Sequence, residues 1–185
     1  MIRALLLIAC ILGLVSLQWK REKVVMDLKV QNYDPELILS ADSWLYKGKP
    51  FTGYRVESDR NGKILYQLPI IKGKAEGEAQ GWFDTGEKMM LRHFKNGKQE
   101  GNFIQWWPNG NIRYCFHYKE GLLNGQQIVN FPDGHHKQES NYLYGNEEGI
   151  QRIWNEAGIL LSNYTIKNHK IYGIVQVKVC MPIDH

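Results

Sequence analysis

The chain has 185 residues, of which 43% are hydrophobic and 23% charged, and its formal net charge is +4. This length and composition fit one ordinary domain and exclude collagen-like, mucin-like and wholly disordered proteins. Glycine is the unusual component, because the chain has 18 glycines and average usage would give about 13 in this length. The positions of these glycines therefore indicate how the chain is organised.

Most of the positive charge lies in the first 23 residues. Arg3, Lys20, Arg21 and Lys23 outweigh Glu22 there, which leaves a net charge of only +1 for the rest of the chain. A nucleic-acid-binding domain needs clustered Lys and Arg residues to displace counterions from several phosphates. No such cluster follows residue 23, and we therefore expect no nucleic-acid partner.

The N-terminal segment carries the one targeting signal of the sequence. An apolar run from Ala4 to Leu17 lies between Arg3 and the basic cluster at 20–23. This run is shorter than the roughly 20 residues that span a bilayer comfortably, and it is typical of a signal peptide or a short anchor. We expect residues 1–23 to form a hydrophobic helix that places the protein at the membrane or exports it to the cell envelope.

Several interpretations of this segment stay open. Residues 7–10, ending at Cys10, resemble a lipoprotein cleavage box, but few residues precede Cys10 and apolar sequence follows it. An uncleaved anchor is therefore favoured over acylation of Cys10, and a buried helix of a cytoplasmic protein is the third alternative. The membrane orientation is also open, because the heavier positive flank favours a cytoplasmic C-terminal side while the signal-like start favours export.

The glycines follow a period of 24 residues. With Gly48, which is one residue out of step, 16 of the 18 glycines fall into three columns. The columns are Gly73, Gly97, Gly121 and Gly145; then Gly53, Gly77, Gly101, Gly125, Gly149 and Gly173; then Gly62, Gly86, Gly110, Gly134 and Gly158. This regularity predicts about five and a half units of a tandem repeat.

Each unit is predicted to be a β-hairpin. The third column provides turn glycines, Gly62, Gly86, Gly110, Gly134 and Gly158, most of them preceded by Asn, Asp or Pro. Asn-Gly and Asp-Gly supply the positive φ that tight hairpin turns require. A short aromatic or β-branched run follows each turn, and a second glycine-containing reversal such as residues 95–98 follows the run, which gives two strands and two turns per unit.

Alternation along the strands predicts which side chains share a face. Eight residues after each turn glycine lies an apolar ladder, formed by Ile70, Phe94, Tyr118, Tyr142 and Ile166. On the preceding strands, Trp82, Trp106 and Trp154 share one column, and Phe83, Trp107 and Phe131 share the next. Their spacing equals the repeat period, which favours packing within the sheet over a ligand site. Trp106 and Trp107 remain candidates for a partly exposed site that contacts a partner.

The predicted fold class is all-β: an elongated antiparallel β-meander or open solenoid of tandem 24-residue hairpins after the N-terminal helix. In such an array each unit contacts mainly its neighbours. We expect residues 24–44 to form a linker and capping strand, 45–178 the repeat array, and 179–185 a C-terminal tail.

The repeat units are similar to those of a known family. YKGKPFTGYRVESDRNGK, FKNGKQEGNFIQWWPNGN and YKEGLLNGQQIVNFPDG resemble the variant MORN (membrane occupation and recognition nexus) repeats of bacterial proteins, often labelled YwqK-type antitoxins. Residues 49–53 resemble the pro-phe-thr-gly start of the first repeat in that family. The resemblance covers roughly 44–178 and implies a non-enzymatic binding scaffold. Two departures, His169 at a glycine position and the polar strand 135–139, suggest a C-terminal cap and a solvent-facing or partner-facing patch.

No catalytic or cofactor motif is recognisable, since the sequence has no P-loop, dinucleotide fingerprint, nucleophile elbow, HExxH or paired-cysteine zinc spacing. We therefore expect no enzyme activity, catalytic residue or cofactor. His135 and His136 are adjacent and would point to opposite faces of a strand, and Cys180, Met181 and His185 lie near the terminus; we expect no metal site from either group.

The cysteines are expected to be unpaired. Cys115 and Cys180 lie about five strands apart, or roughly 20 Å in a meander, which exceeds the limit of about 7 Å between the Cα atoms of a disulfide. We expect Cys115 to lie within a strand.

The resulting functional hypothesis is a monomeric interaction scaffold that binds a protein partner, with Trp106, Trp107, His135 and His136 as the candidate contact residues. Toxin neutralisation is a special case of this hypothesis. The alternative is a membrane-surface module, in which the apolar segment inserts and the basic cluster lies near anionic phospholipid headgroups.

Overall fold

The computed structural model describes residues 26–174, and every regular element in that range is a β-strand. The predicted N-terminal helix, Cys10 and the C-terminal tail lie outside the described residues. Between residues 26 and 174 there is no helix of the length and apolarity needed to cross a membrane. The all-β fold class is therefore confirmed for this part of the chain.

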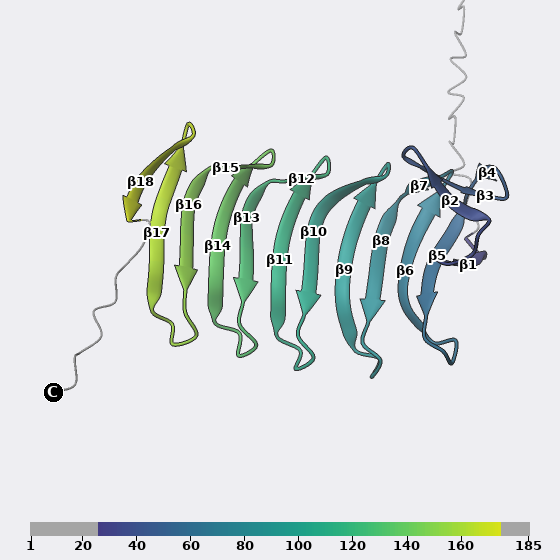
Figure 1. The fold of residues 1–185 in the computed structure, drawn as a ribbon, viewed down its shortest axis with the longest axis horizontal. Coiled ribbons are helices and arrows are strands. Elements are labelled where there is room, and N and C mark those ends of the chain that lie inside the picture. Colours follow the sequence, from purple (N-terminus) through teal and green to yellow (C-terminus); the bar gives the residue numbers. More distant parts are fainter. Residues whose placement is uncertain (1–25, 175–185) are drawn as a thin grey trace, which may run out of the picture.

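The strands form one long open sheet and one small sheet (Figure 1). The N-terminal strands are β1 (Lys29–Gln31), β2 (Leu37–Ser40), β3 (Ser43–Tyr46) and β4 (Lys49–Pro50). The array consists of β5 (Gly53–Ser58), β6 (Ile64–Ile71), β7 (Lys74–Ala75), β8 (Gly77–Trp82), β9 (Lys88–Lys95), β10 (Lys98–Trp106), β11 (Ile112–Lys119), β12 (Leu122–Leu123), β13 (Gly125–Asn130), β14 (His136–Leu143), β15 (Asn146–Glu147), β16 (Gly149–Trp154), β17 (Leu160–Lys167) and β18 (Lys170–Ile174).

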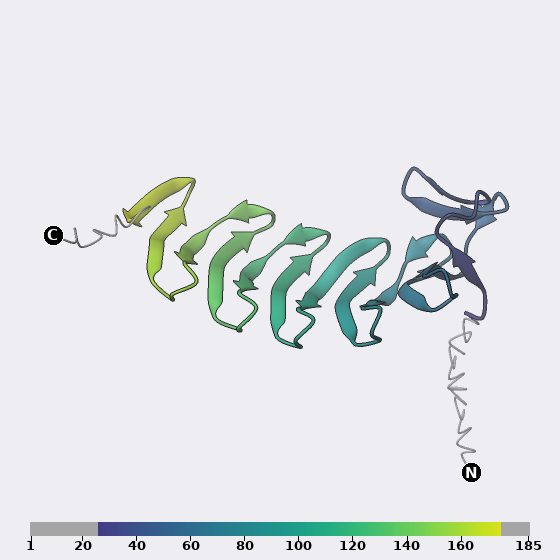
Figure 2. The ribbon, with the colours of Figure 1, turned by 60° about the horizontal axis from the view of Figure 1, so that its bottom comes forward.

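The sheet is mixed rather than wholly antiparallel. Strands β5 to β18 pair with their neighbours in an antiparallel meander, but β1 pairs with β5 in parallel. The antiparallel prediction is therefore wrong at this edge, because β1 is joined to β5 by the intervening small sheet and reaches it in the parallel direction. Strands β2, β3 and β4 fold over the same end of the array (Figure 2). Residues 26–50 thus cover the first edge of the long sheet.

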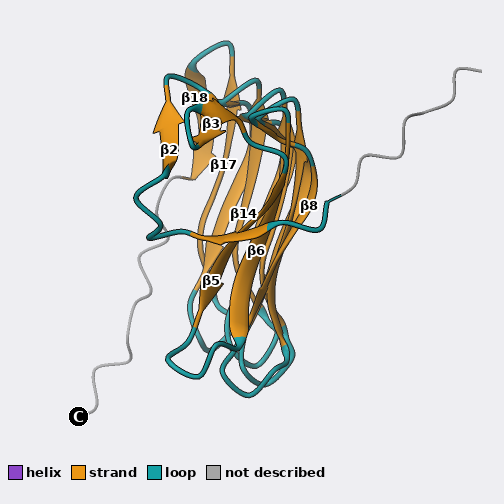
Figure 3. Ribbon diagram, turned by 90° about the vertical axis from the view of Figure 1, so that its right-hand side faces the viewer, coloured by secondary structure: helices purple, strands orange, loops and turns teal. Residues whose placement is uncertain are grey.

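Viewed along its length, the array is a single bowed layer with turns at both ends of the strands (Figure 3). At one end lie two-residue turns in which both central residues have positive φ, the property of type I′ hairpins. Their central pairs are Lys72/Gly73, Asn96/Gly97, Glu120/Gly121, Tyr144/Gly145 and Asn168/His169. We call this end the type I′ edge.

The type I′ turns at Gly73, Gly97, Gly121 and Gly145 also contact the preceding unit. The amide of Gly97 donates to the Ala75 carbonyl at 2.8 Å, and the amide of Gly121 donates to the Gln99 carbonyl at 2.9 Å. A side chain in the preceding unit accepts from the other central residue: the Glu76 carboxylate accepts from the Asn96 amide at 2.6 Å. These bonds connect successive units at the type I′ edge and explain why the first glycine column recurs every 24 residues.

Replacing His169 with glycine is expected to stabilise the last hairpin. His169 is exposed and has φ of +61°, in a place where the earlier units have glycine. A Cβ strains this conformation, and relief of that strain outweighs the added freedom of glycine in the unfolded chain. We expect the free energy of unfolding to rise by about 0.5–1 kcal/mol, measured by urea denaturation. The reciprocal control, Gly145→His, should lower it, and equal stability of both variants would contradict this explanation.

The opposite ends of the hairpins carry a different turn. In each, the first residue accepts from the glycine amide and donates to the carbonyl beyond that glycine, as for Trp107, Gly110 and Asn111 at 2.9 and 2.8 Å. Only the glycine has positive φ, between +74° and +107° across Gly62, Gly86, Gly110, Gly134 and Gly158. This is a type I turn followed by a glycine bulge, and not the Asn-Gly or Asp-Gly turn with two positive φ values. We call this end the bulge-turn edge.

The second glycine column lies at the first residue of β5, β8, β13 and β16 and, at Gly101, within β10. Gly53, Gly77, Gly101, Gly125 and Gly149 all have positive φ. All five are registered opposite members of the apolar ladder, which pairs Gly53 with Ile70, Gly77 with Phe94, Gly101 with Tyr118, Gly125 with Tyr142 and Gly149 with Ile166. Positive φ within a strand bends it. The bend separates the short strands β7, β12 and β15 from β8, β13 and β16.

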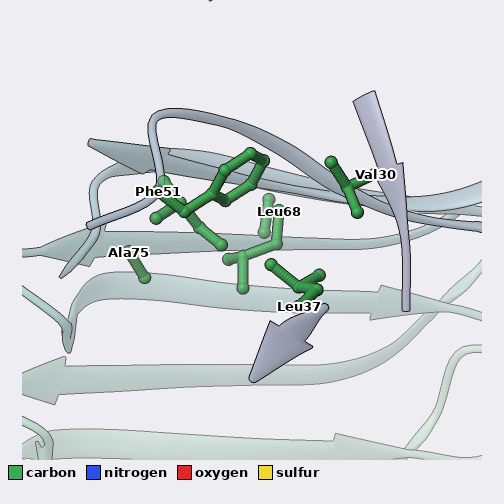
Figure 4. Close-up of a cluster of buried hydrophobic side chains, with 7 residues drawn as sticks. Val30, Leu37, Phe51, Leu68 and Ala75 are labelled. Carbon is green, nitrogen blue, oxygen red and sulfur yellow. The ribbon is translucent and has the colours of Figure 1, made fainter. Parts of the chain in front are cut away.

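The apolar core lies at the N-terminal end of the array (Figure 4). It contains the buried side chains of Val30, Leu37, Phe51, Leu68, Ile70, Ala75 and Ala79. Further along, the buried side chains are mostly polar: Gln127, Asn130, Ser140, Gln151 and Ser162. A single-layer sheet has no second layer to exclude water from its faces. Only the first units gain such cover, from β1 to β4, and local stability should therefore decrease along the array.

Candidate functional site

The bulge-turn edge gathers the aromatic residues that the sequence placed in adjacent columns. Phe83, Trp107 and Phe131 each form the first residue of a bulge turn, and Asp59 and Asn155 take that position in the first and last turns. All three aromatic side chains are half-buried. Because the turns repeat with the period of the sheet, the three rings recur at equivalent places along one edge.

Basic side chains stack on two of these rings. The guanidinium carbon of Arg113 lies 4.4 Å from the centre of the Trp107 ring, and the Lys137 ammonium lies 5.6 Å from the centre of the Phe131 ring. Each cation is six residues after its ring. In the part of the chain that the structure describes, no carboxylate is within ion-pair distance of either cation. We call Trp107, Arg113, Phe131 and Lys137 the cation–aromatic row.

Asn130 connects two of the four predicted contact residues. The Trp107 indole donates to the Asn130 carbonyl at 3.3 Å, and Nδ1 of His136 lies 2.8 Å from Oδ1 of Asn130. The Asn130 amide group donates in turn to the Ile112 carbonyl at 3.0 Å. Trp107 and His136, 29 positions apart in the sequence, are thereby held beside the same asparagine. No pattern in the sequence pointed to Asn130.

The other two predicted contact residues are placed differently. His135 is exposed in the turn and lies 3.2 Å from the Asp133 carboxylate. Trp106 is half-buried at the bulge, where its backbone pairs with Ile112. The structure therefore brings Trp107 and His136 together but leaves His135 and Trp106 apart from them. No group of three or more metal-ligating side chains occurs between residues 26 and 174; Cys180, Met181 and His185 lie outside that range.

Replacing Asn130 with alanine is expected to loosen this part of the edge. The substitution removes the acceptor for His136 and the donor for the Ile112 carbonyl, and Asn130 is only 9% exposed. Loss of hydrogen bonds at a buried group costs about 1–3 kcal/mol, measured by urea denaturation. Asn102→Ala is the matched control, because Asn102 is exposed in strand β10 and its replacement should cost about 0.5 kcal/mol or less. Equal costs would contradict the role assigned to Asn130.

A pocket lies at the bulge-turn edge between the first two units. Its volume is about 540 Å³, within the range of small-ligand sites. Apolar side chains of Leu65, Tyr66, Trp82, Phe83, Met89 and Met90 line it, together with Arg55, Glu57, Asp84 and Arg92. Sequence analysis did not identify this pocket. The available signal was Arg92, a charged residue on a face that is otherwise mostly apolar.

The two arginines of this pocket are in different electrostatic environments. Arg55 donates to Glu57 at 2.8 Å and stacks on the Trp44 and Tyr66 rings. Arg92 stacks on the Phe103 ring at 4.3 Å, and its Nε is buried without a hydrogen-bond partner. Burial raises the pKa of the Tyr66 hydroxyl, although both arginines oppose the rise. Tyr66 is therefore neutral at physiological pH, and the pocket keeps the positive charge of Arg92.

Cys115 lies in β11 as expected, and its thiol is free. Burial raises the pKa of the Cys115 thiol. A raised pKa lowers the thiolate fraction at neutral pH, which makes a nucleophile less reactive.

Comparison with known protein families gives a match to a repeat family. The model described as MORN repeat variant matches residues 99–120. These residues cover β10 from Gln99, one bulge turn, and β11 up to the next type I′ turn, which is almost one 24-residue period. No curated protein matches the chain. The matched unit and the same turn geometry in its neighbours support a MORN-repeat protein.

Proposed function

We propose that this protein is a non-enzymatic β-repeat scaffold that binds another protein through the bulge-turn edge. Its N-terminal segment, residues 1–23, tethers the scaffold to a membrane or directs its export to the cell envelope. The array is the part that recognises the partner, and the segment decides where recognition occurs.

The observation that carries this proposal is the cation–aromatic row. Half-buried Trp and Phe rings, stacked with Arg and Lys side chains, are the residue types enriched where protein interfaces gain their binding energy. Arg113 and Lys137 have no carboxylate partner among the described residues, and they are free to pair with a partner's acidic groups. A rigid repeat array presents several such groups at a regular spacing.

Site-specific photocrosslinking tests this proposal. The photoreactive residue p-benzoylphenylalanine is placed at Phe131 of the full chain, in the cells that produce it, and crosslinked products are identified by mass spectrometry. The matched control places the same residue at Tyr144, which is 49% exposed on the type I′ edge. We expect a discrete protein adduct from position 131 and none from position 144.

Two outcomes would count against the proposal. If position 131 gives no protein adduct, the protein does not bind a partner through the bulge-turn edge. Equal adducts at positions 131 and 144 would indicate nonspecific proximity.

A membrane-surface role is the second candidate, and the basic cluster of Lys20, Arg21 and Lys23 favours it. Each such residue near an anionic surface contributes about 1 kcal/mol of attraction. Sedimentation with phosphatidylserine vesicles, comparing the full chain with a version lacking residues 1–23, separates the alternatives. If the shortened chain still sediments, lipid recognition lies in the repeats; if only the full chain does, the segment is a tether.

An antitoxin-like role is a special case of partner binding. It rests on the resemblance of the units to the variant MORN repeats of bacterial antitoxin-labelled proteins. Identification of the crosslinked partner as a toxin would establish it, and a partner with no toxic activity would exclude it.

A further inference from the structure

The pocket between the first two units has a counterpart further along the bulge-turn edge. The second pocket has a volume of about 270 Å³. Six lining positions of the first pocket recur in it, each 48 residues on, which is two periods of the repeat. Leu65, Tyr66, Trp82, Phe83, Asp84 and Met89 correspond to Arg113, Tyr114, Asn130, Phe131, Pro132 and Lys137. The two pockets are therefore equivalent places in the repeat with different side chains.

Both pockets combine an aromatic wall with a cation that lacks an ion pair. In the first, Tyr66, Trp82 and Phe83 form the aromatic wall, and the buried Nε of Arg92 has no hydrogen-bond partner. In the second, Arg113 lies over Trp107 and Tyr114, and Lys137 lies over Phe131. A cation without an ion pair beside an apolar wall favours a ligand group that has an apolar body and a negative charge.

The carboxylates at the pockets do not cancel these cations. Glu57 is paired with Arg55. Asp84 and Glu156 also line the pockets but are exposed in the turns, where solvent screens them. Arg92, Arg113 and Lys137 form no ion pair within residues 26–174.

We infer that the two pockets together bind one extended acidic segment of the partner protein, in which two aromatic side chains flanked by carboxylates each enter a pocket. This inference rests on the proposed function and specifies the chemistry of the partner. The aromatic ring occupies the apolar wall, and the flanking carboxylate pairs with Arg92 in the first pocket and with Arg113 in the second.

The repeat sets the spacing between the two aromatic side chains. Corresponding strands of the two pockets, β6 and β11, are four steps apart in the sheet, or about 19 Å at the usual distance between strands. An extended chain advances about 3.3 Å per residue, so about six residues cover that distance. A segment with two Phe residues six positions apart therefore reaches both pockets.

Fluorescence anisotropy with labelled synthetic peptides tests this inference on the full chain in detergent. The first peptide contains one Phe between pairs of Asp residues, and the second contains two Phe residues six positions apart in an Asp-rich chain. Matched peptides replace Asp with Lys or Phe with Ser. We expect the two-Phe peptide to bind at least tenfold more tightly than the one-Phe peptide, and both replacements to weaken binding at least tenfold.

The protein variants identify the pockets. R92Q and R113Q should each remove the advantage of the two-Phe peptide, R92K should restore part of it, and K119Q should change affinity less than twofold, because Lys119 lies next to the type I′ edge. Circular dichroism checks that each variant is folded, and R113Q provides the test if R92Q does not fold. Unchanged binding by both folded variants would overturn the inference.

The remaining outcomes also decide it. Equal binding of the Asp and Lys peptides would overturn charge recognition, and equal binding of the Phe and Ser peptides would overturn the role of the pockets. Binding to phosphatidylserine vesicles that depends on Arg92, without peptide binding, would assign the site to lipid instead. A protein crosslinked from position 131 that binds R92Q and R113Q normally would leave the proposed function intact while excluding this inference.

Discussion

Replacing Ile70 with alanine is expected to cause a large loss of stability. Ile70 has 0% exposure and lies in the apolar cluster formed with Leu68, Phe51 and Ala75. Truncation removes buried apolar atoms and leaves a cavity, which for Ile→Ala costs about 3–4 kcal/mol. The free energy of unfolding from urea titration measures this loss, and native-state hydrogen exchange should place it in β5 and β6.

Ile166→Ala is the matched control for this prediction. Ile166 occupies the same ladder position four periods later and is also registered opposite a glycine, Gly149, but it is only half-buried. With no second layer over it, we expect its truncation to cost about 1 kcal/mol. Equal losses at both positions would contradict the conclusion that the N-terminal strands give the first units their extra stability.

The second large effect is expected for Gly53→Ala. A Cβ built on Gly53 would lie 2.3 Å from the carbonyl oxygen of Leu28 and 2.8 Å from Cζ of Phe51. The clash involves backbone that holds β1 against β5, since the Tyr54 amide donates to the same Leu28 carbonyl at 2.8 Å. Relief therefore requires β1 to move away, and we expect a loss of about 3 kcal/mol or more with faster hydrogen exchange in β1.

Gly125→Ala separates the clash from backbone strain. Gly125 lies in the same glycine column with φ of +85°, and a Cβ there would meet no atom within 4 Å. Only the strain of positive φ is then added, at about 1–2 kcal/mol. If thermal unfolding showed the same loss for both variants, docking of β1 on Gly53 would not be the cause.

The repeat itself was predictable from the sequence because its glycines report local backbone geometry. A positive φ strains every residue type more than it strains glycine. Each repeated turn therefore has a glycine at the same position, and these glycines recur at a constant spacing. The ladder of Ile70, Phe94, Tyr118, Tyr142 and Ile166 followed from alternation along the strands, and the register places it on one face.

The type of each turn was not predictable in the same way. Asn-Gly and Asp-Gly suggested two consecutive positive φ values, but at Asn61-Gly62 and Asn109-Gly110 only the glycine has one. At the first of these turns a side chain explains the difference: Oδ1 of Asp59 accepts from the amides of Asn61 and Lys63, which favours a type I turn and a bulge. At the second, Oδ1 of Asn109 accepts from the amide of Asn111. Three of the type I′ turns use Lys72, Glu120 or Tyr144 before the glycine, residues that carry no turn signal. Asn96-Gly97 is the type I′ turn that does carry the Asn-Gly signal.

The candidate site was predicted only in part, for a related reason. Columns of Trp and Phe indicated an aromatic edge, but Asn130 and the Arg92 pocket depend on residues from different units. Contacts such as that of Trp107 with Asn130 join positions 23 apart. The sequence pattern does not indicate which polar side chains of two different units lie next to each other.

By itself, the sequence determined the all-β class, the 24-residue unit and the face of the ladder, because turns and strand alternation are local properties of the backbone. Only the tertiary structure decided that β1 pairs in parallel and that residues 26–50 fold over the first units. It also decided which half-buried cations are left without a carboxylate. These features arise where distant strands compete to cover apolar surface and to pair polar groups, and such competition is settled by packing rather than by local preference.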